Sequence, residues 1–292
     1  GDGCLDALIA APKASVAPLT GTQLRIRKQA GAIYSYSPLQ KVGDTCQLTP
    51  SNTLEPIYVG REPKALAGSA MQKVALDAQY DWQIMFSEPG AANTLSKKSA
   101  GALLLMSRKD AAEYVSVFAQ GSSAGEKLGS RFAVGRFNGV NAQMVVAALA
   151  PGAKAGAIRG GIYWYDISGS PAAQMPTSTF PAAEYARCLF SGDIITFKGV
   201  SSDELIVTSP NCTIASSKHG ALWFVYRGKT SSPWGINQKG WSLGIATAAG
   251  DLNGDDRQDL IVSAKQPYAA GKSLNNAGSI MIIDGQSRTP YI

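Results

Sequence analysis

One short acidic loop carries side-chain oxygen atoms at alternating positions. Positions 1, 3, 5 and 9 of the loop are Asp251, Asn253, Asp255 and Asp259. The backbone carbonyl of Arg257 falls at position 7, and oxygen donors in this arrangement are what Ca²⁺ requires. An EF-hand would continue to a glutamate at position 12 on a helix, whereas position 12 here is Val262 in an apolar, strand-like run. The loop is therefore predicted to bind calcium between two β-strands.

Catalytic chemistry has little support in the chain. The sequence holds one histidine, His219, so Ser-His-Asp, Cys-His and histidine-rich metal sites lack the imidazoles that they need. Residues 121–125 match G-x-S-x-G, but they lead into another strand-like segment, whereas a nucleophile elbow leads into a helix. The sequence predicts a protein that is not an enzyme.

A longer pattern surrounds the acidic loop and recurs five times. Each copy has an apolar run, a polar loop and a glycine that opens a second apolar run. The first runs are residues 8–12, 84–89, 145–148, 205–210 and 260–264, and the second runs open at Gly31, Gly101, Gly161, Gly220 and Gly278. A strand-rich unit repeated about every 60 residues predicts a propeller or a solenoid, because one unit cannot bury its apolar face alone.

This unit resembles the FG-GAP repeat of integrin α-subunit β-propellers and related secreted propellers. The segments that carry the resemblance are the 251–259 loop, Leu128-Gly129, Leu243-Gly244, and the strand ends at Pro12, Pro89 and Pro210. The resemblance implies an all-β propeller of four-stranded blades, with at least five blades here and seven in the intact protein. A single domain, 1–292, would divide at approximately 1–50, 51–118, 119–178, 179–231 and 232–292.

In this family the calcium ion lies between the first two strands of a blade. The fifth repeat has the complete ligand set, whereas the first repeat begins within the loop and supplies only Asp2 and Asp6, at positions 5 and 9. In the third and fourth repeats Arg136 and Lys198 occupy ligand positions, which opposes cation binding. We expect one complete calcium site, one half site, and a first blade completed by an upstream segment or a partner chain.

Loops predicted between the second and third strands of each blade are basic. These loops are residues 13–30, 90–100, 152–160, 211–219 and 265–277, and they contain no Asp or Glu. Their cations are Lys13, Arg25, Arg27, Lys28, Lys97, Lys98, Lys154, Arg159, Lys218, Lys265 and Lys272. In a propeller these loops open on one side, which predicts a basic face for a protein or an anionic glycan or lipid surface. Solubility is the alternative reason for such loops, and nucleic acid is disfavoured because the aromatic residues fall in predicted core strands.

The cysteines fall within single repeats, as Cys4 with Cys46 and Cys188 with Cys212. Such pairs suit disulfides in an oxidising compartment, the alternative being buried free thiols in a cytosolic protein. No apolar run reaches the length of about 18 residues that a membrane-spanning helix needs. The expected location is extracellular or at the cell surface, or periplasmic in a bacterium.

These observations together predict a secreted, calcium-binding module that acts in adhesion or binding through its basic face. One alternative is the accessory propeller of a secreted hydrolase, such as a phospholipase D, with catalysis outside this chain. Another is an architectural subunit of a surface assembly.

Overall fold

The computed structural model describes residues 7–19, 25–36, 39–48, 54–110, 112–137, 143–148, 161–166, 179–180, 192–198, 202–210, 212–214, 217–218, 220–226, 229–230, 241–265 and 278–291. The chain divides into two compact units, Gly1–Ser130 and Arg131–Ile292. The described residues form antiparallel β-sheets and contain no helix, so the prediction of an all-β protein is confirmed. None of them forms a helix that could span a membrane.

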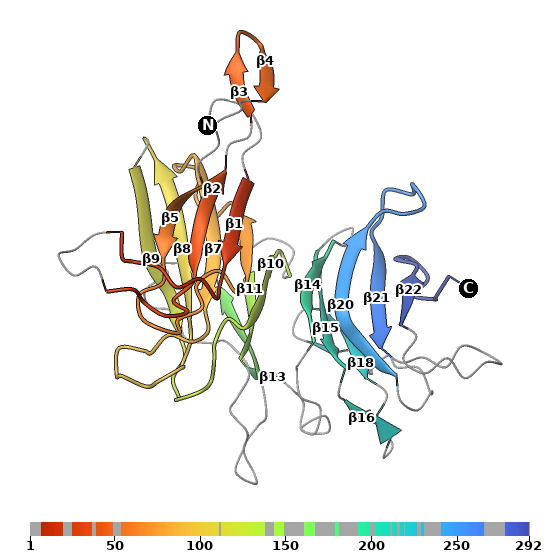
Figure 1. The fold of residues 1–292 in the computed structure, drawn as a ribbon. Helices are drawn as coiled ribbons and strands as arrows, with labels where there is room; N and C mark the ends of the chain where they lie inside the picture. Colours follow the sequence, from red (N-terminus) through yellow and green to blue (C-terminus); the bar gives the residue numbers. More distant parts are fainter. Residues whose placement is uncertain are drawn as a thin grey trace. The chain divides into compact units, whose positions relative to one another are not determined.

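The described residues of unit 1 form two main sheets and one hairpin (Figure 1). The first sheet consists of β1 (Ala7–Ala11), β2 (Ala32–Tyr36) and β5 (Glu55–Val59). The second sheet consists of β6 (Met71–Val74), β7 (Trp82–Glu88), β8 (Ala102–Lys109) and β9 (Ala112–Gln120). The hairpin of β3 (Leu39–Val42) and β4 (Thr45–Leu48) lies between β2 and β5 in the sequence.

The part of unit 2 that the structure describes forms three main sheets, again antiparallel. The third sheet consists of β10 (Arg131–Gly135), β11 (Gln143–Ala148), β12 (Gly161–Asp166) and β13 (Thr179–Phe180). The fourth consists of β14 (Ile194–Phe197), β15 (Glu204–Ser209), β18 (Ala221–Tyr226) and β19 (Lys229–Thr230). The fifth consists of β20 (Ser242–Gly250), β21 (Asp259–Lys265) and β22 (Ser279–Ile283), and β16 (Thr213–Ile214) pairs with β17 (Ser217–Lys218) in a separate hairpin.

The first two sequence repeats, predicted at approximately 1–50 and 51–118, do not divide where the first and second sheets divide. The approximate division of the sequence starts the second repeat at residue 51, whereas β5 (Glu55–Val59) pairs with β2 and belongs to the first sheet. The cause is the β3–β4 hairpin, which separates β2 from its partner along the chain and conceals the pairing in a one-dimensional alignment.

A glycine joins the first sheet to the segment entering the second, the second sheet to the segment that follows it, and the fourth sheet to the fifth, in a contact that we call the inter-sheet joint. It is a parallel bridge from Gly31 to Ala67, from Gly101 to Leu128 and from Gly220 to Leu243. A Cβ atom on Gly101 would lie 2.2 Å from the backbone nitrogen of Leu128, and the φ of Gly101 is +86°. Only glycine permits both this close approach and this backbone conformation.

A hydroxyl group recurs on the second strand of three sheets. The backbone N–H of Ala70 donates to Ser87 Oγ at 3.0 Å, that of Asp193 to Thr208 Oγ1 at 2.7 Å, and that of Ala246 to Ser263 Oγ at 2.9 Å. In the fifth sheet this contact falls where the β20–β21 register shifts, between Leu243 and Thr247. The hydroxyl therefore supplies an acceptor for a backbone N–H where the ladder is interrupted.

An arginine links the fifth sheet to the fourth. Arg288 Nη2 donates to both carboxylate oxygens of Glu204 at 2.9 Å. Its guanidinium carbon lies 4.8 Å from the ring centre of Phe197 and 4.5 Å from that of Phe224. The cation thus lies over two aromatic rings of the fourth sheet and is bound by a carboxylate, and both kinds of contact stabilise it.

Neither Cys46 nor Cys212 is a free thiol. The partners predicted for them, Cys4 and Cys188, lie outside the described residues. The two pairings therefore stay predictions.

Candidate metal centre

The acidic loop connects β20 to β21 in the fifth sheet, as the sequence predicts. Gly250 pairs with Asp259 at the base of the hairpin, so residues 251–258 form the connection. Every residue from Asp251 to Arg257 is exposed, whereas Asp259 is 1% exposed. The loop thus projects into solvent from one buried carboxylate.

Asp251 organises the first half of this loop through its carboxylate. Its Oδ1 accepts the backbone N–H of Gly254 at 2.6 Å and that of Asp255 at 3.3 Å, and its Oδ2 accepts the N–H of Asp256 at 3.0 Å. Gly254 and Asp256 have φ values of +79° and +63°, which turn the backbone around the carboxylate. Three backbone N–H groups are thus directed at the Asp251 carboxylate and fix the conformation of the loop around it.

The other predicted ligands are hydrogen-bonded within the loop as well. Asn253 Oδ1 accepts the N–H of Asp255 at 3.0 Å, and Asp255 Oδ1 accepts the N–H of Arg257 at 2.9 Å. Asp259 Oδ2 accepts the N–H of Leu252 at 3.0 Å, which closes the loop onto its buried end.

The second sheet shows a neutral version of this closure. Gln83 precedes the apolar run of β7 as Asp259 precedes that of β21, and Gln83 Oε1 accepts the N–H groups of Leu76 and Asp77 at 2.8 and 2.9 Å. A side-chain oxygen at this position is therefore used to fold the loop whether or not the calcium spacing is present.

Asp284 and Tyr291, near the end of the sequence, lie beside the loop and are linked to it by hydrogen bonds through Tyr291. The sequence pattern did not reveal them. The Tyr291 hydroxyl donates to Asp284 Oδ2 at 2.8 Å, lies 3.3 Å from Asp259 Oδ1, and accepts from Asn253 Nδ2 at 2.9 Å. Hydrogen bonds from Ser287, chiefly its backbone N–H, lower the pKa of Asp284 to about 2. The hydrogen bond to Asp284 is the main reason that the pKa of Tyr291 is raised to about 12. Beside the loop, Asp284 is therefore favoured as an ionised hydrogen-bond acceptor and Tyr291 as a neutral donor.

The donor set of the loop fits Ca²⁺, because every predicted ligand supplies oxygen. Its conformation is not that of a formed metal cage, since no three His, Cys, Asp or Glu side chains in the described part of the chain are gathered around one point. Asp2 and Asp6, the predicted half site, lie outside the described residues. Calcium binding stays a prediction, with Asp251, Asn253, Asp255, Asp259 and the Arg257 carbonyl as its ligands.

The predicted basic residues are described in part. Lys28 and Lys98 occupy equivalent places in unit 1, because their backbone carbonyls accept the N–H groups of Lys64 and Gly125 in the segments entering the next joint. Both side chains are exposed, as are those of Arg25, Lys97 and, in unit 2, Lys265. The guanidinium of Arg27 makes a hydrogen bond within the protein, since its Nη1 donates to the carbonyl of Gly60 at 2.9 Å. The placement of Lys154, Arg159 and Lys272, and of the Lys218 side chain, lies outside what the structure describes.

Comparison with known families identifies one segment of the chain. Residues 243–282 match the FG-GAP repeat, a span that runs from the start of β20 through the acidic loop and into β22. The resemblance predicted from the sequence is thereby confirmed for this repeat. No curated protein matches the chain.

Proposed function

We propose that this protein, whose residues 243–282 form an FG-GAP repeat, is a non-enzymatic β-propeller that binds calcium and acts as an extracellular or cell-surface binding module. The observation that carries the proposal is the position of the acidic loop, which lies inside the matched repeat and joins two antiparallel strands. The all-β architecture and its four-stranded sheets are consistent with a propeller, and FG-GAP repeats suggest a binding or adhesion role.

The proposed arrangement is a ring of at least five blades, one for each main sheet. Its support is the repeated inter-sheet joint, which links the first sheet to the second and the fourth to the fifth through the same glycine geometry. Identical joints between successive sheets repeat one rotation, and a repeated rotation is how a propeller is generated.

Calcium is proposed to stabilise the fifth blade by neutralising the carboxylates of its loop. Saturating calcium at about 100 times its dissociation constant would stabilise the folded state by about 2.7 kcal/mol. Asp251→Asn is expected to remove most of this gain while keeping a side-chain oxygen for the Gly254 and Asp255 N–H groups. The measurement is the denaturation midpoint of both proteins in excess calcium and in chelator.

The matched control is Asp77→Ala, in the second-sheet loop that lacks the calcium spacing. Asp77 Oδ1 accepts the N–H of Gln79 at 3.0 Å, so its loss should lower stability equally with and without calcium. A wild-type midpoint that calcium does not move would refute the metal site, as would an Asp251→Asn protein that responds like the wild type.

The partner is proposed to be anionic and to bind the edge of unit 1 that carries Lys28 and Lys98. Reversing one charge at this edge, Lys98→Glu, is expected to lower the salt concentration at which the protein leaves immobilised heparin, because charge attraction at a surface is screened by salt. Lys109→Glu is the matched control. It changes the net charge equally but lies at the other end of β8, away from residues 97–101.

Equal displacement of both variants would show that only net charge matters and would contradict a specific basic edge. Arg27 is not suited to this test, because its hydrogen bond to Gly60 ties it to the folded structure.

A further inference from the structure

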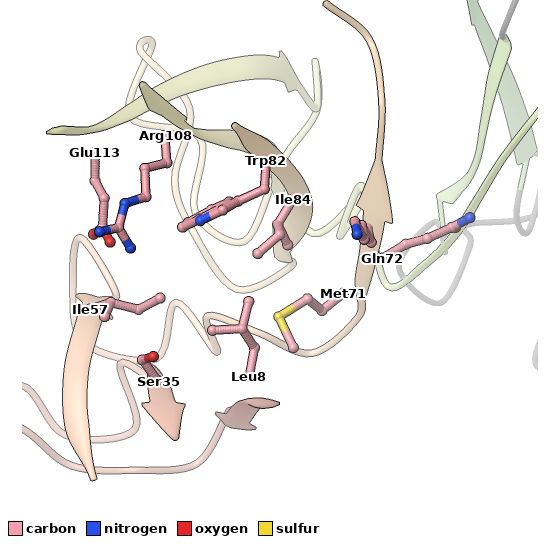
Figure 2. Close-up of a pocket in the computed structure, with 10 residues that line it drawn as sticks. Leu8, Ser35, Ile57, Met71, Gln72, Trp82, Ile84, Arg108 and Glu113 are labelled. Carbon is pink, nitrogen blue, oxygen red and sulfur yellow. The ribbon is translucent and has the colours of Figure 1, made fainter. Parts of the chain in front are cut away.

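A cavity of about 450 Å³ lies between the first and second sheets of unit 1, away from the acidic loop. Its apolar lining comes from Leu8 and Ile57 on the first sheet and from Met71, Trp82 and Ile84 on the second (Figure 2). This volume falls in the range of small-molecule sites, which combine apolar walls with a few polar groups.

The cavity exists because the interface between these sheets is filled at one end only. At the filled end, Tyr58 packs edge-on against Phe86 with ring centres 4.7 Å apart, next to Ile33. Two residues along β2 from Ile33, on the same face, stands the small side chain of Ser35, which lines the cavity. The space opposite Trp82 is thus left open because Ser35 is small, whereas Ile33, the preceding residue on that face of β2, is large.

The open end has the shape of a slot. Figure 2 shows the Trp82 indole nearly edge-on along one wall, with a ring face directed across the space toward Leu8, Ser35 and Ile57. A ligand entering here would have an aromatic face on one side and aliphatic side chains on the other, which favours a flat apolar ring over a bulky or strongly hydrated group.

Two opposite charges stand at one end of this slot. Arg108 is the cross-strand partner of both Trp82 and Glu113, so the three side chains leave the same face of the second sheet in one row. Arg108 and Glu113 both line the cavity, and Figure 2 shows them at the same end of it. A guanidinium offers only donors and a carboxylate only acceptors, so the pair can bind one ligand edge that carries an acceptor beside a donor.

We propose that this cavity is a binding site for a small, flat aromatic molecule whose ring stacks on Trp82. The edge of the ligand that faces Arg108 and Glu113 carries an adjacent hydrogen-bond acceptor and donor, as a carboxamide or a heteroaromatic lactam does. The site lies wholly in unit 1 and does not depend on the calcium loop or on the proposed function.

Four probes test the shape and the edge chemistry of the ligand separately, with the full chain in calorimetry or saturation-transfer NMR. 2-Naphthamide is planar and carries both an acceptor and a donor, and it is expected to bind. Decahydro-2-naphthamide keeps the amide but loses planarity and should bind about tenfold more weakly. 2-Naphthoate and 2-naphthamidine each offer only one kind of hydrogen-bonding group and should fall between the two. Equal binding of the planar and saturated amides, or no detectable binding of 2-naphthamide, would overturn the proposal.

Variants locate the site independently of the probe. Ser35→Leu fills the slot and should abolish 2-naphthamide binding while the denaturation midpoint is retained, and Trp82→Leu should weaken binding at least about tenfold by removing the stacking face. Arg108→Gln should weaken 2-naphthoate more than 2-naphthamidine, whereas Lys109→Gln, the next residue on β8, should change neither. Binding that survives Ser35→Leu in a folded protein would place the ligand elsewhere.

Discussion

Glu88→Ala is expected to lower the free energy of unfolding by about 3 kcal/mol, a large share of the 5–15 kcal/mol typical of a folded domain. Glu88 is fully buried at the end of β7. Its carboxylate accepts the Tyr58 hydroxyl at 2.8 Å, the Arg61 N–H at 3.1 Å and Arg61 Nε at 2.6 Å. Truncation would leave these donors facing an empty space between the first and second sheets, and an unpaired buried donor is costly.

The expected loss is at the lower end for a buried ion pair, because the Arg61 side chain is 34% exposed and water can reach it. Burial and the Glu88 charge both raise the pKa of Tyr58, so its hydroxyl stays protonated and continues to need an acceptor. Urea unfolding compares the wild type with Glu88→Ala, Glu88→Gln and the exposed control Glu113→Ala. The glutamine should recover part of the loss by accepting from Tyr58, and a loss in Glu88→Ala no greater than in Glu113→Ala would contradict a structural role for the carboxylate.

Gly101→Ala is expected to destabilise unit 1 by about 3 kcal/mol or more. The added methyl group would lie 2.2 Å from the nitrogen and 2.4 Å from the carbonyl oxygen of Leu128, and the positive φ adds a second cost. Since backbone atoms cannot rotate away, the joint between the second sheet and the following segment must open.

A glycine in open space separates these two costs. Gly43, in the turn between β3 and β4, has a φ of +63° and no neighbour within 4 Å of an added Cβ. Gly43→Ala should therefore show only the backbone strain, about 1 kcal/mol. Similar denaturation midpoints for the two variants would mean that the joint relaxes without loss, and the importance assigned to its close approach would be wrong.

The strands themselves were predictable from the sequence. The five apolar runs that precede polar loops became β1, β7, β11, β15 and β21, and the glycine-led runs became β2, β8, β12, β18 and β22. This succeeds because burial on a sheet imposes a local pattern, and the pattern repeats about every 60 residues. The acidic loop was found for the same reason, since all its predicted ligands lie within nine consecutive positions of the chain.

Contacts between distant residues were not predictable in this way. Tyr291 meets Asn253 across 38 residues, and Arg288 meets Glu204 across 84. Tyr291 and Arg288 do not belong to the repeated pattern, so the sequence repeats give no sign that they contact Asn253 and Glu204. The buried Glu88 was likewise read as part of a strand end, because nothing nearby in sequence shows that Tyr58 and Arg61 will surround its carboxylate.

The cavity illustrates a further limit. Its presence depends on the small size of Ser35 relative to the space between two sheets, and the neighbouring part of that space is filled by Phe86 and Tyr58 on other strands. Strand patterns indicate which residues face inward, but they do not indicate how well opposite faces fill the volume between them.

The inter-sheet joint is made by main-chain atoms, and it requires a particular residue, glycine, only on one side of the bridge. Loops elsewhere in a repeat can consequently drift in sequence without weakening the attachment of one sheet to the next. This is consistent with a chain in which one hairpin carries an acidic loop with calcium-ligand spacing while the third and fourth repeats place Arg136 and Lys198 at ligand positions. Main-chain atoms therefore hold the sheets together, whereas loop side chains determine what the protein binds. New binding surfaces can evolve on the loops while the arrangement of the sheets is unchanged.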